Sequence, residues 1–278
     1  MTNAEKLTLA KHACHIRMGV IEGTHSAKCG HPGGSLDIAE VLSYLYFVDM
    51  NIDPREPKKP DRDRFVLSKG HAAPCYYAVL GERGFFDKAE FKNFRQLHSF
   101  LQGHPDAKKC PGVDASTGSL GQGISIAVGM ALGAKKLDHS DVKVYTLLGD
   151  GELQEGQVWE AVMTAAQHKL DNLCAMVDYN RVQLDGTLAE IKDLGDLAAK
   201  WRDFGWNVIE LDGHDIQAVV EAYRQAKVCK GKPTVLMANT IKGKGVSFME
   251  NDCNWHGNAP NAEQLRQALS ELGLEGEQ

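Results

Sequence analysis

Short apolar runs alternate with amphipathic stretches through the second half of the chain, and this alternation constrains the fold more than any other feature of the sequence. The spacing predicts strands over residues 142–148, 173–178, 206–211 and 234–239, and helices over 157–170, near 193–204 and over 215–229. Strands that alternate with helices form a parallel sheet covered by helices on both faces. We therefore predict a doubly wound α/β fold, organised as a single domain over residues 1–278. Such sheets bind ligands beyond the carboxyl ends of their strands.

The first half of the chain is expected to be largely helical. Apolar residues at helical spacing predict a helix over 4–22, and Ser35 is expected to cap the start of a second helix. Asp87 and Glu90 have the spacing of a capping box that opens a further helix. Residues 121–137 predict a helix unusually rich in Gly and Ala. Since each Gly lowers helix propensity by about 1 kcal/mol, we expect a second backbone to pack closely against this helix, either within the chain or across an interface.

The composition excludes several classes of protein. A formal net charge of −6, without a dense Lys/Arg cluster, argues against a nucleic-acid-binding surface. The seven cysteines are scattered and lack CxxC spacing, which is typical of reduced thiols and not of a disulfide framework or a zinc site. The sequence has neither an apolar signal-peptide core near its start nor an apolar run of about 18 residues. We expect a cytoplasmic protein that contacts neither nucleic acid nor membrane.

A carboxylate between two glycines follows the first strand of the alternating region. In the stretch LLGDGELQEG, the run 142–148 ends directly before Gly149, Asp150 and Gly151. The next strand ends shortly before Asn180, and in a right-handed βαβ unit the two turns lie at the same edge of the sheet. A carboxylate and an amide oxygen make a good Mg²⁺ site once a bound diphosphate adds oxygens of its own. The N–H groups around the glycines are expected to hold those phosphate oxygens.

Gly149-Asp150-Gly151, followed about thirty residues later by Asn180, resembles the thiamine-diphosphate motif. Six further stretches resemble the N-terminal portion of transketolase, in order and with similar spacing: AKCGHPGG (27–34), DRFVLSKGHAAP (63–74), FRQLHSFLQGHP (94–105), STGSLGQG (116–123), LDGHD (211–215) and HGNAP (256–260). The resemblance covers nearly the whole chain. It implies the thiamine-diphosphate-binding fold, with thiamine diphosphate as cofactor and Mg²⁺ as its metal, for which Ca²⁺ or Mn²⁺ are expected substitutes.

The same resemblance implies roles for individual residues. His31, His71, His104 and His256 are expected to be catalytic residues that line the substrate channel, bind sugar hydroxyls and assist proton transfer. The implied cofactor-binding residues are His71, Gly118, Leu120, Gly149, Asp150, Gly151, Glu155 and Asn180, and the implied metal ligands are Asp150, Asn180 and the backbone carbonyl of Val182. Glu155 matches an acid at the dimer interface of transketolases, although the helix dipole alone also favours an acid at a helix N-terminus.

The four catalytic candidates each adjoin a glycine. A neighbouring glycine keeps the loop backbone thin and exposes the imidazole, which exchanges protons near neutral pH. The histidines that match no motif are expected to be surface residues, and they are His12, His15, His139 and His168. His98 and His214 lie inside motifs, but we expect them to have structural roles.

The implied protein is the N-terminal subunit of a split, thiamine-diphosphate-dependent transketolase. This transferase moves a two-carbon ketol unit between sugars, which we expect to be sugar phosphates. After HGNAP only residues 261–278 follow, in which Leu265, Leu269 and Leu272 predict one amphipathic helix. The expected partner is therefore a C-terminal transketolase subunit, which supplies the pyrimidine-binding domain and the catalytic glutamate in an α₂β₂ heterotetramer. The alternatives are a component of a deoxyxylulose-phosphate-synthase-like or 2-oxoacid-decarboxylating enzyme, and a non-catalytic nucleotide- or metal-binding regulator.

Overall fold

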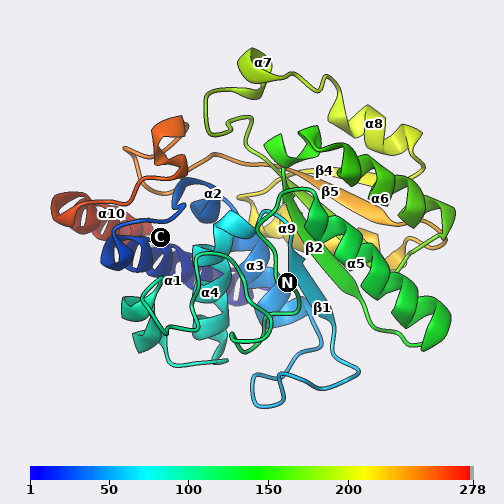
Figure 1. Ribbon diagram of the computed structural model, residues 1–278, viewed down its shortest axis with the longest axis horizontal. Coiled ribbons are helices and arrows are strands. Elements are labelled where there is room, and N and C mark those ends of the chain that lie inside the picture. The colour runs from blue at the N-terminus through cyan, green and yellow to red at the C-terminus, as the bar shows by residue number, and fades with distance from the viewer. Residues whose placement is uncertain (276–278) are drawn as a thin grey trace.

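A five-stranded, wholly parallel sheet forms the centre of the computed structural model, which describes residues 1–275 (Figure 1). The strands are β1 (Arg64–Leu67), β2 (Val144–Gly149), β3 (Leu173–Tyr179), β4 (Asn207–Asp212) and β5 (Thr234–Asn239), and they lie in the order β1-β2-β3-β5-β4. Every neighbouring pair is parallel. The inner strands β2, β3 and β5 are almost entirely buried, because helices cover them on both sides, and this burial explains their continuous apolar sequence.

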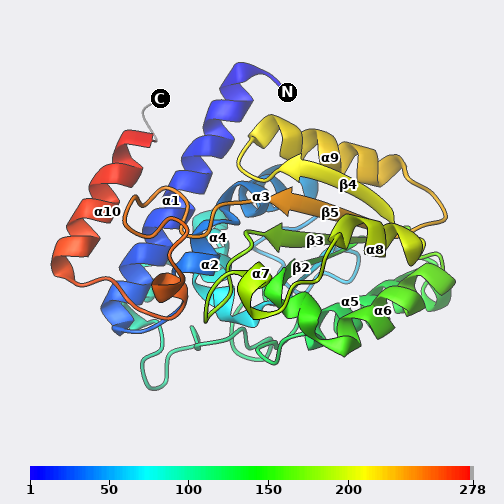
Figure 2. The same ribbon diagram turned by 90° about the horizontal axis from the view of Figure 1, so that it is seen from above.

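Helices pack on both faces of this sheet (Figure 2). One face carries α5 (Gln122–Leu132), α6 (Gly156–Gln167) and α8 (Leu197–Asp203), and the other carries α1 (Asn3–Ala27), α3 (Ala39–Tyr44), α4 (Ala73–Arg83) and α9 (Ile216–Val228). The remaining helices are α2 (Gly33–Leu36), α7 (Leu188–Ile191) and α10 (Ala262–Glu275), of which α10 lies beside α1. Each face of the sheet has its own apolar core. The predicted doubly wound α/β fold is confirmed. Within residues 1–275, no helix combines the length and apolar character needed to cross a membrane.

The register of β2 and β3 determines where the first candidate residues lie. Gly149, at the end of β2, pairs with Asp178 in β3, so Asp150 and Asn180 follow at the same edge of the sheet. The chain then passes through α8 to the outer strand β4 and returns through α9, on the opposite face, to place β5 beside β3. Strands β3 and β5 are therefore neighbours, but α8, which leads from β3 to β4, and α9, which leads from β4 to β5, lie on opposite faces of the sheet. The carboxyl end of such a strand pair is the usual ligand site of an open α/β sheet.

Two predictions for the first half of the chain need correction, and one strand there was not predicted. β1 has no counterpart among the predicted strands, because four residues after a charged loop are too few to show a pattern. Ser35 does not cap a helix, since it lies inside α2 and donates its hydroxyl to the carbonyl of His31 at 2.7 Å. Asp87 accepts from the N–H of Ala89, but Lys88–Asn93 is a 3₁₀ helix, and Glu90 accepts from an asparagine within it instead of closing a capping box.

The Gly- and Ala-rich segment forms α5 and a π-helical turn (Gly133–Leu137), and its glycines lie in two different environments. A Cβ on Gly123 would lie 2.5 Å from Cα of Ser68, the residue after β1, so this glycine allows two backbones to touch. A Cβ on Gly129 would meet no atom within 4 Å, and the nearby Ile126 is 36% exposed. Packing against Ser68 therefore explains the glycine near the N-terminal end of α5, whereas the helix surface around Gly129 faces outward.

Alanine substitutions at two glycines of α5 should have opposite effects. Gly129→Ala should raise the free energy of unfolding by up to about 1 kcal/mol, because alanine is the better helix former and its methyl group meets no neighbour. Gly123→Ala gains the same propensity but forces the backbone at Ser68 to move, so we expect a net loss of about 1–3 kcal/mol. Urea unfolding followed by circular dichroism measures both. Equal shifts for the two variants would contradict a tight Gly123–Ser68 contact.

Candidate active site

The carboxyl ends of β2 and β3 border a cavity of about 260 Å³. The cavity is lined by nine residues that the sequence predicts for the site: His71, Leu120, Gly149, Asp150, Gly151, Glu155, Asn180, Val182 and His256. Residues without a predicted role also line it, among them Lys69, Glu152, Asp178 and Lys242. The other predicted residues are His31, His104 and Gly118. The ring of His31 lies next to those of His71 and His256, the ring of His104 lies next to that of His31, and Gly118 lies against the ring of His104. The structure thus brings the whole predicted set into one region.

Asp150 lies directly after β2 and is only 3% exposed. Its carboxylate accepts hydrogen bonds from the backbone N–H groups of Gly151, at 2.7 Å, and Arg181, at 2.5 Å. Burial, with the charge of Asp178 added to it, raises the pKa of Asp150 to about 7. A carboxylate buried in this way is stabilised in its ionised form by a cation bound beside it.

Asn180 and Val182 lie in the loop that follows β3. The side-chain amide of Asn180 donates to Asp178 at 3.1 Å, and its oxygen accepts from the N–H of Val182 at 2.9 Å. The carbonyl of Val182 accepts from Nζ of Lys242 at 2.8 Å. The backbone of the same loop donates to Asp150. The three predicted metal ligands therefore belong to one hydrogen-bonded group.

The backbone N–H groups of the two glycines around Asp150 have hydrogen-bond acceptors within the chain. The N–H of Gly149 donates to Glu152 at 3.0 Å, and the N–H of Gly151 donates to Asp150. A phosphate bound there would replace these acids as acceptor, so the role of the two N–H groups in holding phosphate stays a prediction. The small size of Gly151 also keeps the turn thin: a Cβ on Gly151 would lie 3.3 Å from Cβ of Gln183, in the loop after β3.

A buried ion pair beside the predicted ligands was missed by the sequence analysis. Lys69, two residues after the end of β1, is 2% exposed and donates to Asp178 at the end of β3 and to the carbonyl of Gly34. Burial opposes charge on both partners, but their mutual attraction outweighs it, so the pKa of Lys69 is raised and that of Asp178 is lowered. Thr240, after β5, adds a hydrogen bond to Asp178. The ion pair and Thr240 together connect the carboxyl ends of β1, β3 and β5.

The buried charges around Asn180 fit a bound cation. This network contains three carboxylates, those of Asp37, Asp150 and Asp178, but two ammonium groups, those of Lys69 and Lys242. One oxygen of Asp37 has no hydrogen-bond partner within the described part of the chain. Burial and the charge of Asp178 raise the pKa of Asp37 well above its usual value. Because burial raises the pKa of both Asp37 and Asp150, protons neutralise part of this negative charge in the metal-free chain; a divalent cation beside Asp150 would take over that role, and oxygen ligands are those that Mg²⁺ prefers.

The four predicted catalytic histidines form one cluster. The ring centroid of His31 lies 5.3 Å from that of His71, 5.5 Å from that of His256 and 6.3 Å from that of His104. The rings of His71 and His256 are 5.0 Å apart, and both line the cavity. Four loops that are distant in sequence therefore bring their imidazoles together next to the predicted metal ligands.

Burial keeps the clustered histidines neutral. It lowers the pKa of His31 to about 4 and that of His256 to about 3, and the positive charges of Arg95 and Lys242 add to the effect. Nζ of Lys242 lies 3.0 Å from Nδ1 of His256. Since an ammonium group can only donate, the neutral ring of His256 is assigned its proton on Nε2. Among the described residues, Nδ1 of His31 has no hydrogen-bond partner, which leaves it available to a polar ligand.

Three further residues differ in how the structure uses them. Gly118 adopts a φ of +156°, and a Cβ there would lie 3.2 Å from the ring of His104, so the glycine permits this loop contact. Glu152, which the sequence analysis did not single out, is buried and accepts from the hydroxyl of Ser68 and the N–H groups of Gly121 and Gly149. Glu155 is exposed at the N-cap of α6, where its side chain makes no capping hydrogen bond.

Residues 9–278 match the family described as "Transketolase, thiamine diphosphate binding domain". The chain belongs to the transketolase family. It is 46% identical to the 6-deoxy-6-sulfo-D-fructose transketolase subunit of Clostridium sp. (strain MSTE9), over 98% of both chains. It is 42% identical to an apulose-4-phosphate transketolase subunit of Phocaeicola vulgatus, over 92% of this chain and 90% of that one. Transketolase from Leishmania mexicana has a TM-score of 0.90 at 31% identity, over 95% of this chain.

This transketolase-family chain spans 41% of the Leishmania transketolase, whereas it spans nearly the whole of the two subunit relatives. The prediction of an N-terminal transketolase portion is confirmed, as are the fold and the enzyme class, a thiamine-diphosphate-dependent transferase of the transketolase type. The roles of the individual site residues stay predictions.

The neutrality of His31 has a measurable consequence. In the unfolded chain a histidine has a pKa of about 6.5, so between pH 6.5 and 4 the unfolded state binds a proton that the folded state excludes. Exclusion of this proton leaves the free energy of unfolding unchanged above about pH 6.5, where His31 is neutral in both states, and lowers it increasingly as the pH falls toward 4. NMR titration of ¹³C-labelled histidines should give His31 a midpoint below about 5, assigned by the resonance that disappears in His31→Gln. A midpoint at the ordinary value would contradict the burial of this ring.

Proposed function

We propose that this chain binds the diphosphate end of thiamine diphosphate, together with Mg²⁺, in the cavity beside β2 and β3. The connected group of Asp150, Asn180 and the Val182 carbonyl carries the proposal, because it offers three oxygen ligands beside buried carboxyl groups that a bound cation would hold in their ionised form. A hard cation bound there takes its remaining ligands from phosphate oxygens and water. Ca²⁺ and Mn²⁺ are expected to substitute, since both accept oxygen ligands. The oxygens of Asn180 and Val182 each accept one hydrogen bond in the metal-free chain, which leaves a second lone pair on each for the cation.

The histidine cluster supports a role in handling the sugar. Neutral imidazoles both donate to and accept from hydroxyl groups, and His31, His104 and His256 are proposed to hold the sugar and move its protons. His71 lines the same cavity as Asp150, so we assign it contact with both cofactor and substrate. When bound, thiamine diphosphate supplies the chemistry that breaks and forms the carbon–carbon bond. The proposed reaction is transfer of a two-carbon ketol unit from a ketose to an aldose.

The substrates are proposed to be sugars that carry an anionic group, in particular sugar phosphates. The names of the two subunit relatives specify a sulfonated sugar for one and a phosphorylated sugar for the other. Both sugars are anionic.

We propose further that Gly118 and Leu120 contact the middle of the cofactor. Residues 1–278 are proposed to act as one domain, and the enzyme is proposed to work in the cytoplasm.

Asp150→Ala should lower the affinity of the chain for thiamine diphosphate in the presence of Mg²⁺ by at least about 100-fold, and Asn180→Ala by roughly 10-fold. The reason is that each variant removes one oxygen ligand from the proposed metal. Calorimetric titration of the purified chain measures both, and Asp185→Ala is the matched control because it removes an exposed acid from the loop after β3. Wild-type affinity in folded Asp150→Ala and Asn180→Ala would refute the site.

We propose that a second polypeptide completes the enzyme. Two relatives that this chain matches over nearly their whole length are named as subunits, and the Leishmania transketolase is more than twice as long as the part matched here. The proposed partner is a C-terminal transketolase subunit, which supplies the pyrimidine-binding domain and the catalytic glutamate in an α₂β₂ assembly. The outward face of α5 supports a contact there, since Ile126 is exposed and Gly129 is open. Glu155 is exposed at the N-cap of α6, which packs beside α5, and is proposed to face the same interface.

The chain alone should show no ketol transfer with Mg²⁺ and thiamine diphosphate, and adding the product of the adjacent reading frame should restore it. Gly129→Arg should weaken that assembly, because the arginine projects from the open face of α5 without disturbing the fold. Native mass spectrometry measures the assembly, and Val228→Arg, at a 76% exposed position on α9, is the matched control. Robust turnover by the isolated chain would refute the need for a partner. Equal assembly of the two arginine variants would place the interface away from α5.

A further inference from the structure

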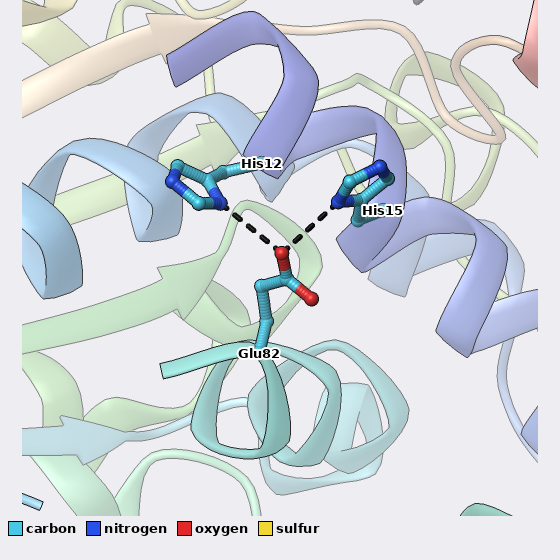
Figure 3. A group of neighbouring side chains, drawn as sticks. All are labelled: His12, His15 and Glu82. Atoms are coloured by element: carbon cyan, nitrogen blue, oxygen red, sulfur yellow. Dashed lines mark hydrogen bonds and ion pairs between the residues drawn. The ribbon is translucent and has the colours of Figure 1, made fainter. Parts of the chain in front are cut away.

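A second group of ligating side chains lies between α1 and α4 (Figure 3). Nδ1 of His12 and Nδ1 of His15 lie 3.2 and 3.0 Å from one oxygen atom, Oε1 of Glu82. The three ligating atoms all lie within 4.8 Å of one another. His12 and His15 are three residues apart on α1 and share one face of the helix. None of the three residues lines the cavity of the candidate active site.

We propose that His12, His15 and Glu82 form a binding site for a divalent transition-metal ion of the Zn²⁺ type. Bonds of about 2.0–2.2 Å from Zn²⁺ to imidazole nitrogen and carboxylate oxygen place the ligand atoms of a tetrahedral site about 3.3–3.5 Å apart. The two nitrogen–oxygen distances are already close to that value. Two histidines and one glutamate, with water in the fourth position, form a common ligand set of open zinc sites.

The surroundings hold two of the three ligands in place. The ring of His12 stacks on Phe47 with centroids 3.7 Å apart and is 24% exposed, so it is not the free surface histidine that the sequence analysis expects. The Glu82 side chain is 9% exposed, and its other oxygen accepts from Lys88 at 2.6 Å. Although burial opposes charge, hydrogen bonds from Lys88 and both histidines lower the pKa of Glu82 to about 2. His15 is 54% exposed and can rotate to close the site.

The ligand chemistry separates this site from the one proposed for the cofactor. Imidazole nitrogens favour Zn²⁺, Ni²⁺ and Cu²⁺, whereas Mg²⁺ and Ca²⁺ favour oxygen. In the metal-free chain each Nδ1–H donates to the Glu82 carboxylate; in the metal-bound chain each neutral ring carries its proton on Nε2 and gives the Nδ1 lone pair to the ion. The ion replaces two hydrogen bonds with three coordination bonds and fastens α1 to α4.

Calorimetric titration of the full chain with ZnCl₂, in millimolar Mg²⁺, tests the proposal. We expect one Zn²⁺ per chain and a rise in Tm, because an ion that binds the folded state stabilises it. His15→Gln should weaken this binding by roughly 100-fold, since loss of even an outer partner of a metal ligand costs about 10–100-fold. His168→Gln, exposed at the C-terminal end of α6, is the matched control and should bind as the wild type does.

The other histidines and the cysteines offer competing Zn²⁺ ligands, so the variants decide the outcome. His15→Gln should keep the metal-free Tm of the wild type because the side chain is mainly exposed. Glu82→Gln is a second variant, expected to lose the same equivalent of Zn²⁺. X-ray absorption should show two imidazole ligands in the wild type. Unchanged stoichiometry and affinity in both variants would assign the ion to another group, and no saturable binding by the wild type would also overturn the proposal.

Discussion

The buried ion pair between Lys69 and Asp178 is the interaction on which the arrangement of the active site depends. It joins the loop after β1 to the end of β3, with Thr240 after β5 and the carbonyl of Gly34 as further partners. Because β2 lies between β1 and β3, Lys69 crosses the end of β2, where a Cβ on Gly149 would lie 3.5 Å from the lysine side chain. Removing one member of such a pair leaves an uncompensated buried charge and costs about 3–5 kcal/mol. The same charges create the environment that favours a cation beside Asp150.

Three glycines in the loops around the active-site histidines allow close packing between those loops. A Cβ on Gly70 would lie 2.7 Å from the backbone nitrogen of Gly118, and a Cβ on Gly118 would meet the ring of His104 at 3.2 Å. A Cβ on Gly33 would lie 2.8 Å from the carbonyl of Trp255, the residue before His256. Each missing side chain allows two loops to touch. This close approach brings the rings of His71, His256 and His104 to 5.3, 5.5 and 6.3 Å from the ring of His31.

The proposed metal sites differ in ligand chemistry and in burial. The ligands around Asp150 are oxygens in a buried network of charges, which favours a hard cation and a diphosphate. The ligands around Glu82 include two imidazole nitrogens, one of them on a half-exposed ring, which favours a softer ion. Mg²⁺ and Zn²⁺ therefore do not compete for the same group. One site serves the proposed chemistry, and the other joins α1 to α4.

Local pattern was sufficient for the second half of the fold. The strands predicted over 142–239 match β2 to β5 within about two residues. The inner strands β2, β3 and β5 are buried on both faces and carry continuous apolar runs, whereas the outer strand β4 is only partly buried. The predicted helix near 193–204 is α8, and the short α7 before it was not predicted. The convergence of Asp150 and Asn180 also followed from sequence, since it needs only consecutive parallel strands.

The amino-acid sequence by itself thus determined the element types, the family resemblance and the two side chains at the carboxyl ends of β2 and β3. Only the tertiary structure decided which charged groups are buried together. Lys69 and Asp178 lie more than a hundred residues apart, and their pairing depends on the strand order, which no local pattern encodes. The approach of His12 and His15 to Glu82 likewise depends on how α1 packs against α4. Burial of charge is a long-range property, because the groups that compensate it come from distant parts of the chain.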